Sequence, residues 1–432
     1  MSDASMRLLR AASWNLVDQV LSALSNLVLS IVVARSVSSA GFGAFAIAFV
    51  TFGIGIAVTK SVVGQPLQIR FSAAAAHEQR AAMAAALGCA LAIGLAGGLV
   101  VACVGLLLGG VVGAALVALA VVLPGLLLQD SCRMAAFAVG RPRLAAAIDA
   151  LWAIEQFALV AVLLFAGLGT VPGLVLAWGV SAALSAVPGL IGLRARPRLA
   201  GAVGWLRDHA ELIRYLLPEY FLSLGAMQFG ILLVGLIASA DAVGSLRAAQ
   251  VLLGPLGVLG AAVFQFAVPE IARRPDRSDR DRWRFAIGIG GGLGLVTVCY
   301  LALLLALPEA VGTALFGDSW AGAAAVLLAM GCSSVASALA NGPAGVLYGM
   351  GKARRTFRIN VAKGPALIAA LLLGTWWAGA VGAGWAFAAV EALVLPAWIA
   401  TLRLSLRPEA PHPVPAPPAV AAEASTLVGD AS

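Results

Sequence analysis

Long apolar runs, each of about 20 residues or more, recur along almost the whole chain. An α-helix rises about 1.5 Å per residue, so a run of about 20 residues crosses the hydrocarbon core of a bilayer, which is about 30 Å thick. Membrane β-strands need only about ten residues of alternating polarity, a pattern that these runs lack. Only 11% of the 432 residues are charged and 61% are hydrophobic, whereas about 25% are charged in a soluble domain. The sequence therefore predicts an all-α polytopic membrane protein, whose helices pair their own backbone groups.

The apolar runs divide into twelve predicted transmembrane spans, six on each side of an arginine-rich segment. Their ranges are 13–35, 40–66, 82–108, 111–131, 144–168, 172–193, 215–238, 243–268, 285–307, 319–349, 359–378 and 381–404. With this division, most of the 28 basic residues fall on one side of the membrane, and the positive-inside rule makes that side cytoplasmic. Each half then starts and ends in the cytoplasm. This predicts two parallel six-helix repeats with both termini cytoplasmic.

The chain is accordingly predicted to have five parts. They are a cytoplasmic arm (1–12), an N-terminal six-helix bundle (13–193), a basic cytoplasmic linker (194–214), a C-terminal six-helix bundle (215–404) and a Pro/Ala-rich cytoplasmic tail (405–432). The tail contains too few apolar residues and too many prolines to pack, so we expect it to be disordered.

Several classes of function are excluded by what the sequence lacks. The segment 345–353 departs from the phosphate-binding pattern GxxxxGK[ST] at Val346 and Ala353, so we do not expect this chain to hydrolyse ATP. The five cysteines form no CxxC pair and the three histidines lie in polar segments, so neither a metal site nor another cofactor is expected. The loops opposite the cytoplasm are too short to carry acid–base or nucleophilic groups, which argues against an enzyme. The position of the positive charge argues against nucleic acid as a partner.

Ionisable side chains inside the spans are the candidate functional residues, because burying them in lipid is costly. The candidates for a substrate-binding lumen are Asp18, Arg35, Lys60, Glu155, Arg247 and Glu391. Glu155 and Glu391 fall near the bilayer midplane with no adjacent cation, so they are also the candidates for coupling to protons or sodium ions. Structural roles remain open: Asp18 and Lys60 can form an ion pair, Arg35 can extend to the outer headgroups, and either glutamate can be protonated and hydrogen-bonded.

Two segments carry a resemblance to a known family. The first is 12–50 (ASWNLVDQVLSALSNLVLSIVVARSVSSAGFGAFAIAFV), whose small-residue run ends in the turn Gly41-Phe42-Gly43. The second comprises 346–364 (VLYGMGKARRTFRINVAKG) and 379–393 (GAVGAGWAFAAVEAL). They resemble the N-terminal part and the last helices of Wzx-type polysaccharide or O-antigen flippases. These belong to the multidrug/oligosaccharidyl-lipid/polysaccharide (MOP) exporter superfamily.

The resemblance implies two bundles that face each other around a central cavity, which opens alternately to either side of the bacterial inner membrane. The implied substrate is an undecaprenyl-diphosphate-linked oligosaccharide for lipopolysaccharide, capsule or exopolysaccharide. A cation such as Arg35, Lys60 or Arg247 would then meet the diphosphate. The implied partners are membrane lipids and a glycan polymerase or other assembly proteins.

Two other functions remain open from the sequence. A multidrug or cation antiporter of the same superfamily would use Glu155 or Glu391 as its ion site. A scaffold of a glycan-assembly complex would transport nothing. The major-facilitator class, which also has twelve helices, is disfavoured because 64–80 lacks the glycine, acid and basic pair usual in its second loop.

Overall fold

The computed structural model describes residues 21–72, 74–221, 225–272 and 276–406. The expected arm 1–12, Asp18 and almost all of the tail lie outside the described residues. In the described part every regular element is a helix. Two of them are short 3₁₀ helices, Leu199–Gly201 and Gly317–Ser319. The others are, in chain order, Leu21–Ser36, α2 (Ser39–Thr59), a π-helical turn (Lys60–Gly64), α3 (Gln65–Phe71), α4 (Ala76–Leu108), α5 (Gly110–Ala138), α6 (Pro142–Phe165), α7 (Val171–Leu193), α8 (Ala202–Asp208), α9 (Ala210–Tyr220), α10 (Ala226–Ile237), α11 (Ala240–Ala272), α12 (Asp279–Leu305), α13 (Glu309–Phe316), α14 (Trp320–Gly349) and α15 (Ala353–Ser405).

The expected all-α membrane class is confirmed. Within the described ranges, nine helices are long and apolar enough to cross a membrane, and Leu21–Ser36 and Ala226–Ile237 are shorter apolar helices. α15 contains two residues with non-helical backbone, Ala378 and Gly379, which divide it into two packed halves. Each of the twelve predicted ranges overlaps one of these helical segments. The number of crossings and their grouping into two repeats stay predictions.

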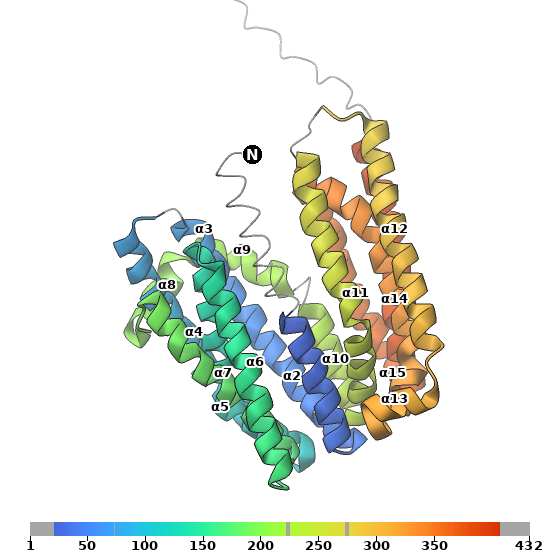
Figure 1. Cartoon of the computed structure of the whole chain (residues 1–432). Coiled ribbons are helices and arrows are strands. Elements are labelled where there is room, and N and C mark those ends of the chain that lie inside the picture. The colour runs from blue at the N-terminus through green and yellow to red at the C-terminus, as the bar shows by residue number, and fades with distance from the viewer. Residues whose placement is uncertain (1–20, 73, 222–224, 273–275, 407–432) are drawn as a thin grey trace, which may run out of the picture.

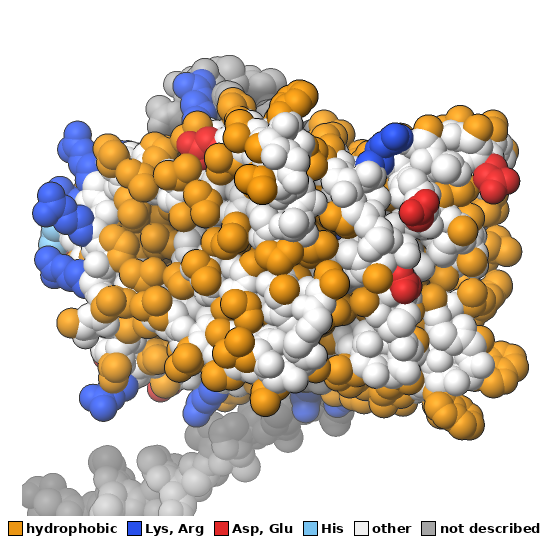
Figure 2. Space-filling view, turned by 90° about the horizontal axis from the view of Figure 1, so that it is seen from below, with side chains coloured by type: hydrophobic (Ala, Val, Ile, Leu, Met, Phe, Trp, Pro, Cys, Tyr) orange, Lys and Arg blue, Asp and Glu red, His pale blue; other side chains and the backbone are white. Residues whose placement is uncertain are grey.

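Large apolar side chains cover much of the outer surface, as expected where lipid is the solvent. Phe165 is 93% exposed and Leu107 is 87% exposed. A soluble protein does not leave such side chains together in water. Figure 2 shows one end of the molecule, which is covered mainly by apolar and uncharged atoms. The surface thus supports a multi-pass membrane protein.

The helices form two lobes that converge at one end of the molecule and diverge towards the other (Figure 1). The N-lobe comprises α2–α9 and the C-lobe comprises α10–α15. The end at which the lobes diverge carries α3 and the start of α12, with Arg70, Arg280 and Arg284, and is called the basic end here. The other end carries α13 and is called the opposite end. Leu21–Ser36 lies in front of the gap between the lobes.

Contacts between the lobes hold the opposite end together. Gly43 at the start of α2 packs so closely on Ala240 of α11 that a Cβ at Gly43 would overlap the Ala240 carbonyl. A Cβ at Gly244 would lie 3.1 Å from the backbone nitrogen of Gly43. Arg35 also donates a hydrogen bond to the carbonyl of Ala314 in α13. The first turn of α2 and the first turn of α11 therefore cross with no side chain between them.

The arginine-rich segment 194–214 is packed on the N-lobe. The Trp205 indole donates to the carbonyl of Val62 at 2.9 Å and stacks on His209, with ring centroids 3.9 Å apart. The backbone nitrogen of Arg198 donates to the carbonyl of Ala84 at 2.9 Å. This segment and α9 lead from the basic end of the N-lobe towards α10, which packs with α15 in the C-lobe.

Candidate substrate cavity between the lobes

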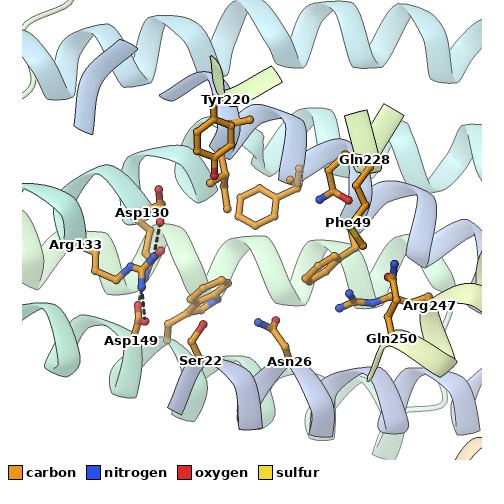
Figure 3. A pocket seen from close by; sticks show the side chains of 17 residues that line it. Ser22, Asn26, Phe49, Asp130, Arg133, Asp149, Tyr220, Gln228, Arg247 and Gln250 are labelled. Carbon is orange, nitrogen blue, oxygen red and sulfur yellow. Dashed lines mark hydrogen bonds and ion pairs between the residues drawn. The ribbon is translucent and has the colours of Figure 1, made fainter. Parts of the chain in front are cut away.

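A cavity of about 320 Å³ lies between the two lobes (Figure 3). Its wall includes side chains from both lobes and from the helix Leu21–Ser36. The lining residues are Ser22, Asn26, Phe49, Phe52, Gly53, Ile56, Ala57, Gln129, Asp130, Arg133, Asp149, Trp152, Tyr220, Met227, Gln228, Arg247 and Gln250. Polar and ionisable groups from opposite lobes therefore share one space, and transporters commonly place their substrate site at such an interface.

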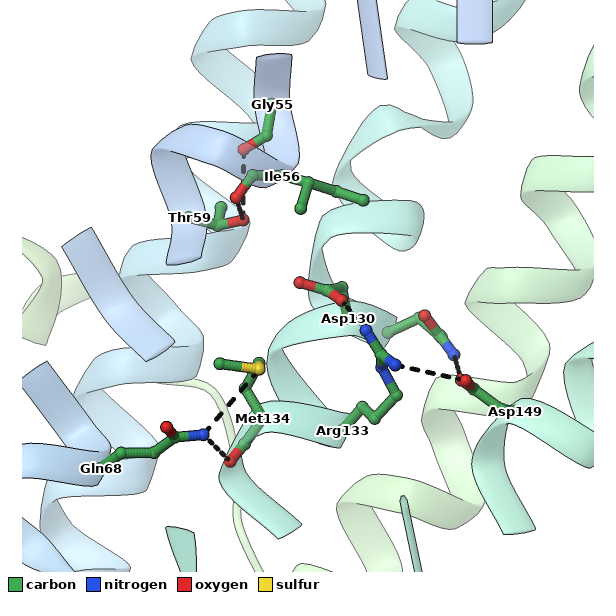
Figure 4. A network of polar contacts seen from close by, with 9 residues as sticks. Gly55, Ile56, Thr59, Gln68, Asp130, Arg133, Met134 and Asp149 are labelled. Carbon is green, nitrogen blue, oxygen red and sulfur yellow. Dashed lines mark hydrogen bonds and ion pairs between the residues drawn. The ribbon is translucent and has the colours of Figure 1, made fainter. Parts of the chain in front are cut away.

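The N-lobe wall holds a buried charged network from α5 and α6 (Figure 4). Arg133 donates to Asp130 Oδ1 at 2.7 Å and lies 3.5 Å from Asp149 Oδ2. Gln129 donates to Asp149 Oδ1 at 2.9 Å. Asp130 and Arg133 are three residues apart on one helix, so they occupy the same face. The network is thus fixed by helix geometry and by the packing of α5 on α6.

One acceptor in this network is incomplete. Asp130 Oδ2 is buried and has no hydrogen-bond partner, and Lys60 acts on Asp130 electrostatically from the neighbouring π-helical turn. Two carboxylates and one guanidinium leave Asp130, Arg133 and Asp149 with a net formal charge of −1. A buried carboxylate oxygen without a partner is costly, so this oxygen is open to a further hydrogen-bond donor or a cation.

The C-lobe wall is cationic. The Arg247 guanidinium lies over the Phe49 ring, 3.8 Å from its centroid. Its Nε and the Gln250 Nε2 are buried and have no hydrogen-bond partner. Among the described residues no carboxylate pairs with Arg247. Figure 3 shows Arg247 and Gln250 on the side of the cavity opposite Asp130 and Arg133. This wall offers hydrogen-bond donors without acceptors, as an anionic ligand requires.

Arg247 is held in place by an aromatic cluster in the N-lobe. Phe49 stacks on Trp178 with ring centroids 5.4 Å apart, and Phe52 meets Trp178 edge-on at 4.9 Å. The Trp152 indole donates to the carbonyl of Trp178 at 3.1 Å. Aromatic contacts of this kind fix ring orientation. The Phe49 ring is therefore held in a fixed orientation, and the Arg247 guanidinium of the other lobe packs on it.

A second pocket of about 430 Å³ adjoins the cavity. The two share Asn26, Phe49, Arg247 and Gln250, and the second pocket adds mainly apolar residues. These are Ala23, Leu24, Leu27, Val251, Gly254, Pro255 and Val258. Arg247 therefore lies at the boundary between a polar space and an apolar one. A molecule that joins an anionic group to an apolar chain matches this arrangement.

Of the five candidates that lie within the described residues, only Arg247 lines the cavity. Arg35 binds the Ala314 carbonyl at the opposite end. Lys60 lies in the π-helical turn behind Asp130. Glu155 on α6 has an unpartnered, buried Oε2 but does not line the cavity.

The remaining two candidates need separate comment. Glu391 forms an ion pair with Lys363 between the two halves of α15. The expectation that Glu391 has no adjacent cation is therefore wrong, because the hairpin in α15 brings together residues 28 positions apart. Asp18 lies outside the described residues, so its pairing with Lys60 stays a prediction.

Sequence reasoning missed the N-lobe network. The predicted spans 111–131 and 144–168 contain Asp130 and Asp149, but neither residue is among the candidates from the sequence, and Arg133 falls in the predicted cytoplasmic loop between them. In the structure α5 continues to Ala138, which places Arg133 inside a helix with Asp130. The available signal was the (i, i+3) spacing of Asp130 and Arg133, followed by the apolar segment 134–139. Together these features indicate a continuing helix with an internal ion pair.

Comparisons with known proteins establish the fold. No protein-family model and no curated protein matches the sequence. One similar solved structure is "Lipid II flippase MurJ, inward closed conformation", with a TM-score of 0.71 and 9% sequence identity over 91% of this chain and 87% of that one. An inward-facing multidrug-resistance MATE transporter of the MOP superfamily has a TM-score of 0.63 and 13% identity over 92% of this chain and 94% of that one. A MOP superfamily transporter from Pyrococcus furiosus has a TM-score of 0.57 and 12% identity over 94% of this chain and 96% of that one. At such identities the likeness concerns the fold. The chain shares the helical fold of these transporters along nearly its whole length.

Proposed function

We propose that this protein is a flippase that moves a polyisoprenyl-diphosphate-linked oligosaccharide, an O-antigen, capsule or exopolysaccharide repeat unit, from the inner to the outer leaflet of the bacterial inner membrane. It would do so by alternating access, with twelve transmembrane helices in two parallel repeats and both termini in the cytoplasm. The observation that carries the proposal is the position of Arg247 between the polar cavity and the apolar pocket.

The chemistry of the two spaces matches the two parts of such a substrate. A diphosphate supplies acceptors for the unpartnered donors of Arg247 and Gln250. Each hydrogen bond to a charged group contributes about 1.5–3 kcal/mol. The sugar would occupy the polar cavity and the polyisoprenyl chain the apolar pocket between Leu24 and Val258. A hydrophilic substrate would leave the apolar pocket unused.

The fold supports alternating access. The lobes are joined at the opposite end by the contact of Gly43 with Ala240 and by Arg35 with Ala314. The lobes also share a hydrophobic cluster, in which Ile47 of α2 is buried with Val243 and Leu246 of α11. Closing the basic end while opening the opposite end would therefore separate packed side chains as well as these contacts. The similar MurJ and MATE structures are described as inward closed and inward-facing.

Coupling to protons or sodium ions is part of the proposal. Glu155 and Glu391 are the candidates from the sequence, and we add Asp130, whose Oδ2 is buried at the cavity wall without a partner. The ion pair with Lys363 already neutralises the charge of Glu391. Asp130 is therefore the favoured residue for binding the coupling ion beside the substrate.

The test is transfer of a fluorescent undecaprenyl-diphosphate oligosaccharide across proteoliposomes, with and without a proton or sodium gradient. We expect transfer that is lost in Arg247→Gln and kept in Arg284→Gln, which removes an exposed arginine of α12. Gradient-driven movement of cationic dyes without lipid transfer would instead identify a multidrug antiporter. A protein that moves neither would be a scaffold of an assembly complex.

A further inference from the structure

A second site lies outside the cavity, at the basic end of the N-lobe. It is a groove of about 750 Å³, called the basic groove here. α4 contributes Arg80, Ala81 and Ala84, α7 contributes Val187, Leu190 and Ile191, and the following segment contributes residues 194–198. The groove and the cavity share no lining residue.

Four arginines converge on the basic groove. They are Arg80, Arg194, Arg196 and Arg198, all of them exposed. In the described part of the chain none of the four pairs with a carboxylate. The nearest acid in sequence, Glu78, lies 4.0 Å from His77. Four guanidinium groups around one space, with no carboxylate beside them, form a binding site for an anion.

The backbone of the groove is fixed. Arg194 ends α7 in the left-handed conformation at φ 53°, and is the one non-glycine described residue with positive φ. Its N–H donates to the Ile191 carbonyl at 3.0 Å. The segment that follows packs tightly on α4. The backbone of Arg198 lies directly on Gly88 and leaves no space there for a Cβ. The arginines thus project from a defined frame and not from a free loop.

The other wall of the groove is apolar and exposed. Ile191 is 71% exposed and Val187 is 51% exposed, one turn apart on α7. A free phosphate would contact the arginines and leave this wall bare. A phospholipid uses both walls: its acyl chains lie along α7 and its phosphate meets the arginines. Basic pockets of this kind between helices bind anionic headgroups.

We propose that the basic groove binds an anionic diacyl phospholipid from the leaflet around the basic end, with its phosphate held by Arg194, Arg196 and Arg198. The site is independent of the cargo proposed for the cavity. It couples the N-lobe to the charge of that leaflet through a defined site.

The test measures binding of phosphatidylglycerol to the full-length protein by native mass spectrometry. The test variant is Arg194→Gln/Arg196→Gln/Arg198→Gln. The control variant Arg280→Gln/Arg284→Gln/Arg354→Gln removes the same charge from exposed positions of the C-lobe. Each basic residue near an anionic lipid contributes about a factor of five, so the test variant should weaken binding by roughly 100-fold. The control should change it less than about threefold, and phosphatidylcholine should not bind above background.

Two results would overturn the proposal. Equal losses in the test and control variants would mean that general surface charge attracts the lipid. Displacement of phosphatidylglycerol by millimolar inorganic phosphate would identify a site for a free anion. If the triple variant fails to fold, Ala81→Trp fills the groove and keeps its charges, with Ala302→Trp on the exposed face of α12 as its control. Unchanged lipid binding in Ala81→Trp would contradict the proposal as well.

Discussion

Arg247 and Asp130 face the cavity from opposite lobes, and each keeps a buried polar atom without a partner. A transport site needs such atoms, because a residue whose hydrogen bonds are already complete gains little from a substrate. Glu391 illustrates the contrast, since its charge is already satisfied by Lys363. The site is therefore defined by buried polar atoms that have no hydrogen-bond partner within the protein.

The shape of the Arg247 side chain, as well as its charge, is expected to matter. A guanidinium stacks flat on Phe49 and offers a planar pair of donors to a diphosphate, whereas an ammonium does neither. Arg247→Lys should therefore weaken binding of the diphosphate lipid about tenfold, and Arg247→Gln by about 100-fold. Fluorescence titration of the labelled lipid measures both, with Arg284→Lys as the control. Equal binding by Arg247→Lys and the unchanged protein would show that charge alone suffices.

Arg133 is expected to stabilise the N-lobe. Replacing it with Gln removes the ion pairs of two buried carboxylates, Asp130 and Asp149. Breaking a buried pair from one side costs about 3–5 kcal/mol, which lowers the midpoint of unfolding in detergent. Adding Asp130→Asn to Arg133→Gln should recover part of the loss. An unfolding midpoint for Arg133→Gln equal to that of Arg284→Gln would refute a structural role for the network.

Among the elements, α2 and α11 control the opposite end through Gly43 and Ala240. An Ala at Gly43 places a methyl group on the Ala240 carbonyl, so the first turns of the two helices must separate. We expect Gly43→Ala to favour the state that is open at the opposite end. Gly257→Ala, in α11 with nothing within 4 Å, should leave the state unchanged and is the control.

The readout is the rate at which a maleimide labels Ile47→Cys in a variant without native cysteines. Ile47 is buried beside this helix crossing. A membrane-impermeant maleimide should label Ile47→Cys faster in the Gly43→Ala background. Labelling at the same rate in both glycine variants would show that the crossing does not hold this end closed.

At the element scale, hydropathy and charge predicted helical segments well but their ends poorly. Apolar runs locate the part of a helix that lies in lipid, and every predicted range overlaps a helix. Helices continue beyond the lipid, however, and α5 extends seven residues past its expected end at 131, to Ala138. That extension carries Arg133 and was mistaken for a loop. The charge network between helices also depends on which faces of α5 and α6 meet, and a single sequence does not contain this information.

Over the whole molecule, the cavity is lined by the N-lobe network on one side and Arg247 on the other, so moving the lobes changes the distance between opposite charges. Substrate binding at Arg247 and ion binding at Asp130 would both alter the attraction between the lobes. This gives a physical route from either ligand to the relative position of the lobes.

Alternating access predicts that the two ends of the molecule move in opposite directions. Spin labels at the exposed residues His77 and Arg280 report on the basic end, and labels at Leu168 and Val311 report on the opposite end. Binding of the diphosphate lipid should shift the distances between labels at His77 and Arg280 to shorter values. It should shift the distances between labels at Leu168 and Val311 to longer values. Arg35→Gln, which removes the hydrogen bond to Ala314, should lengthen the distances at the opposite end without substrate. Labels at His77 and Leu168, both in the N-lobe, provide the control and should not move. Changes of the same sign at both ends would contradict alternating access, because rigid lobes that pivot about the cavity cannot open at both ends together.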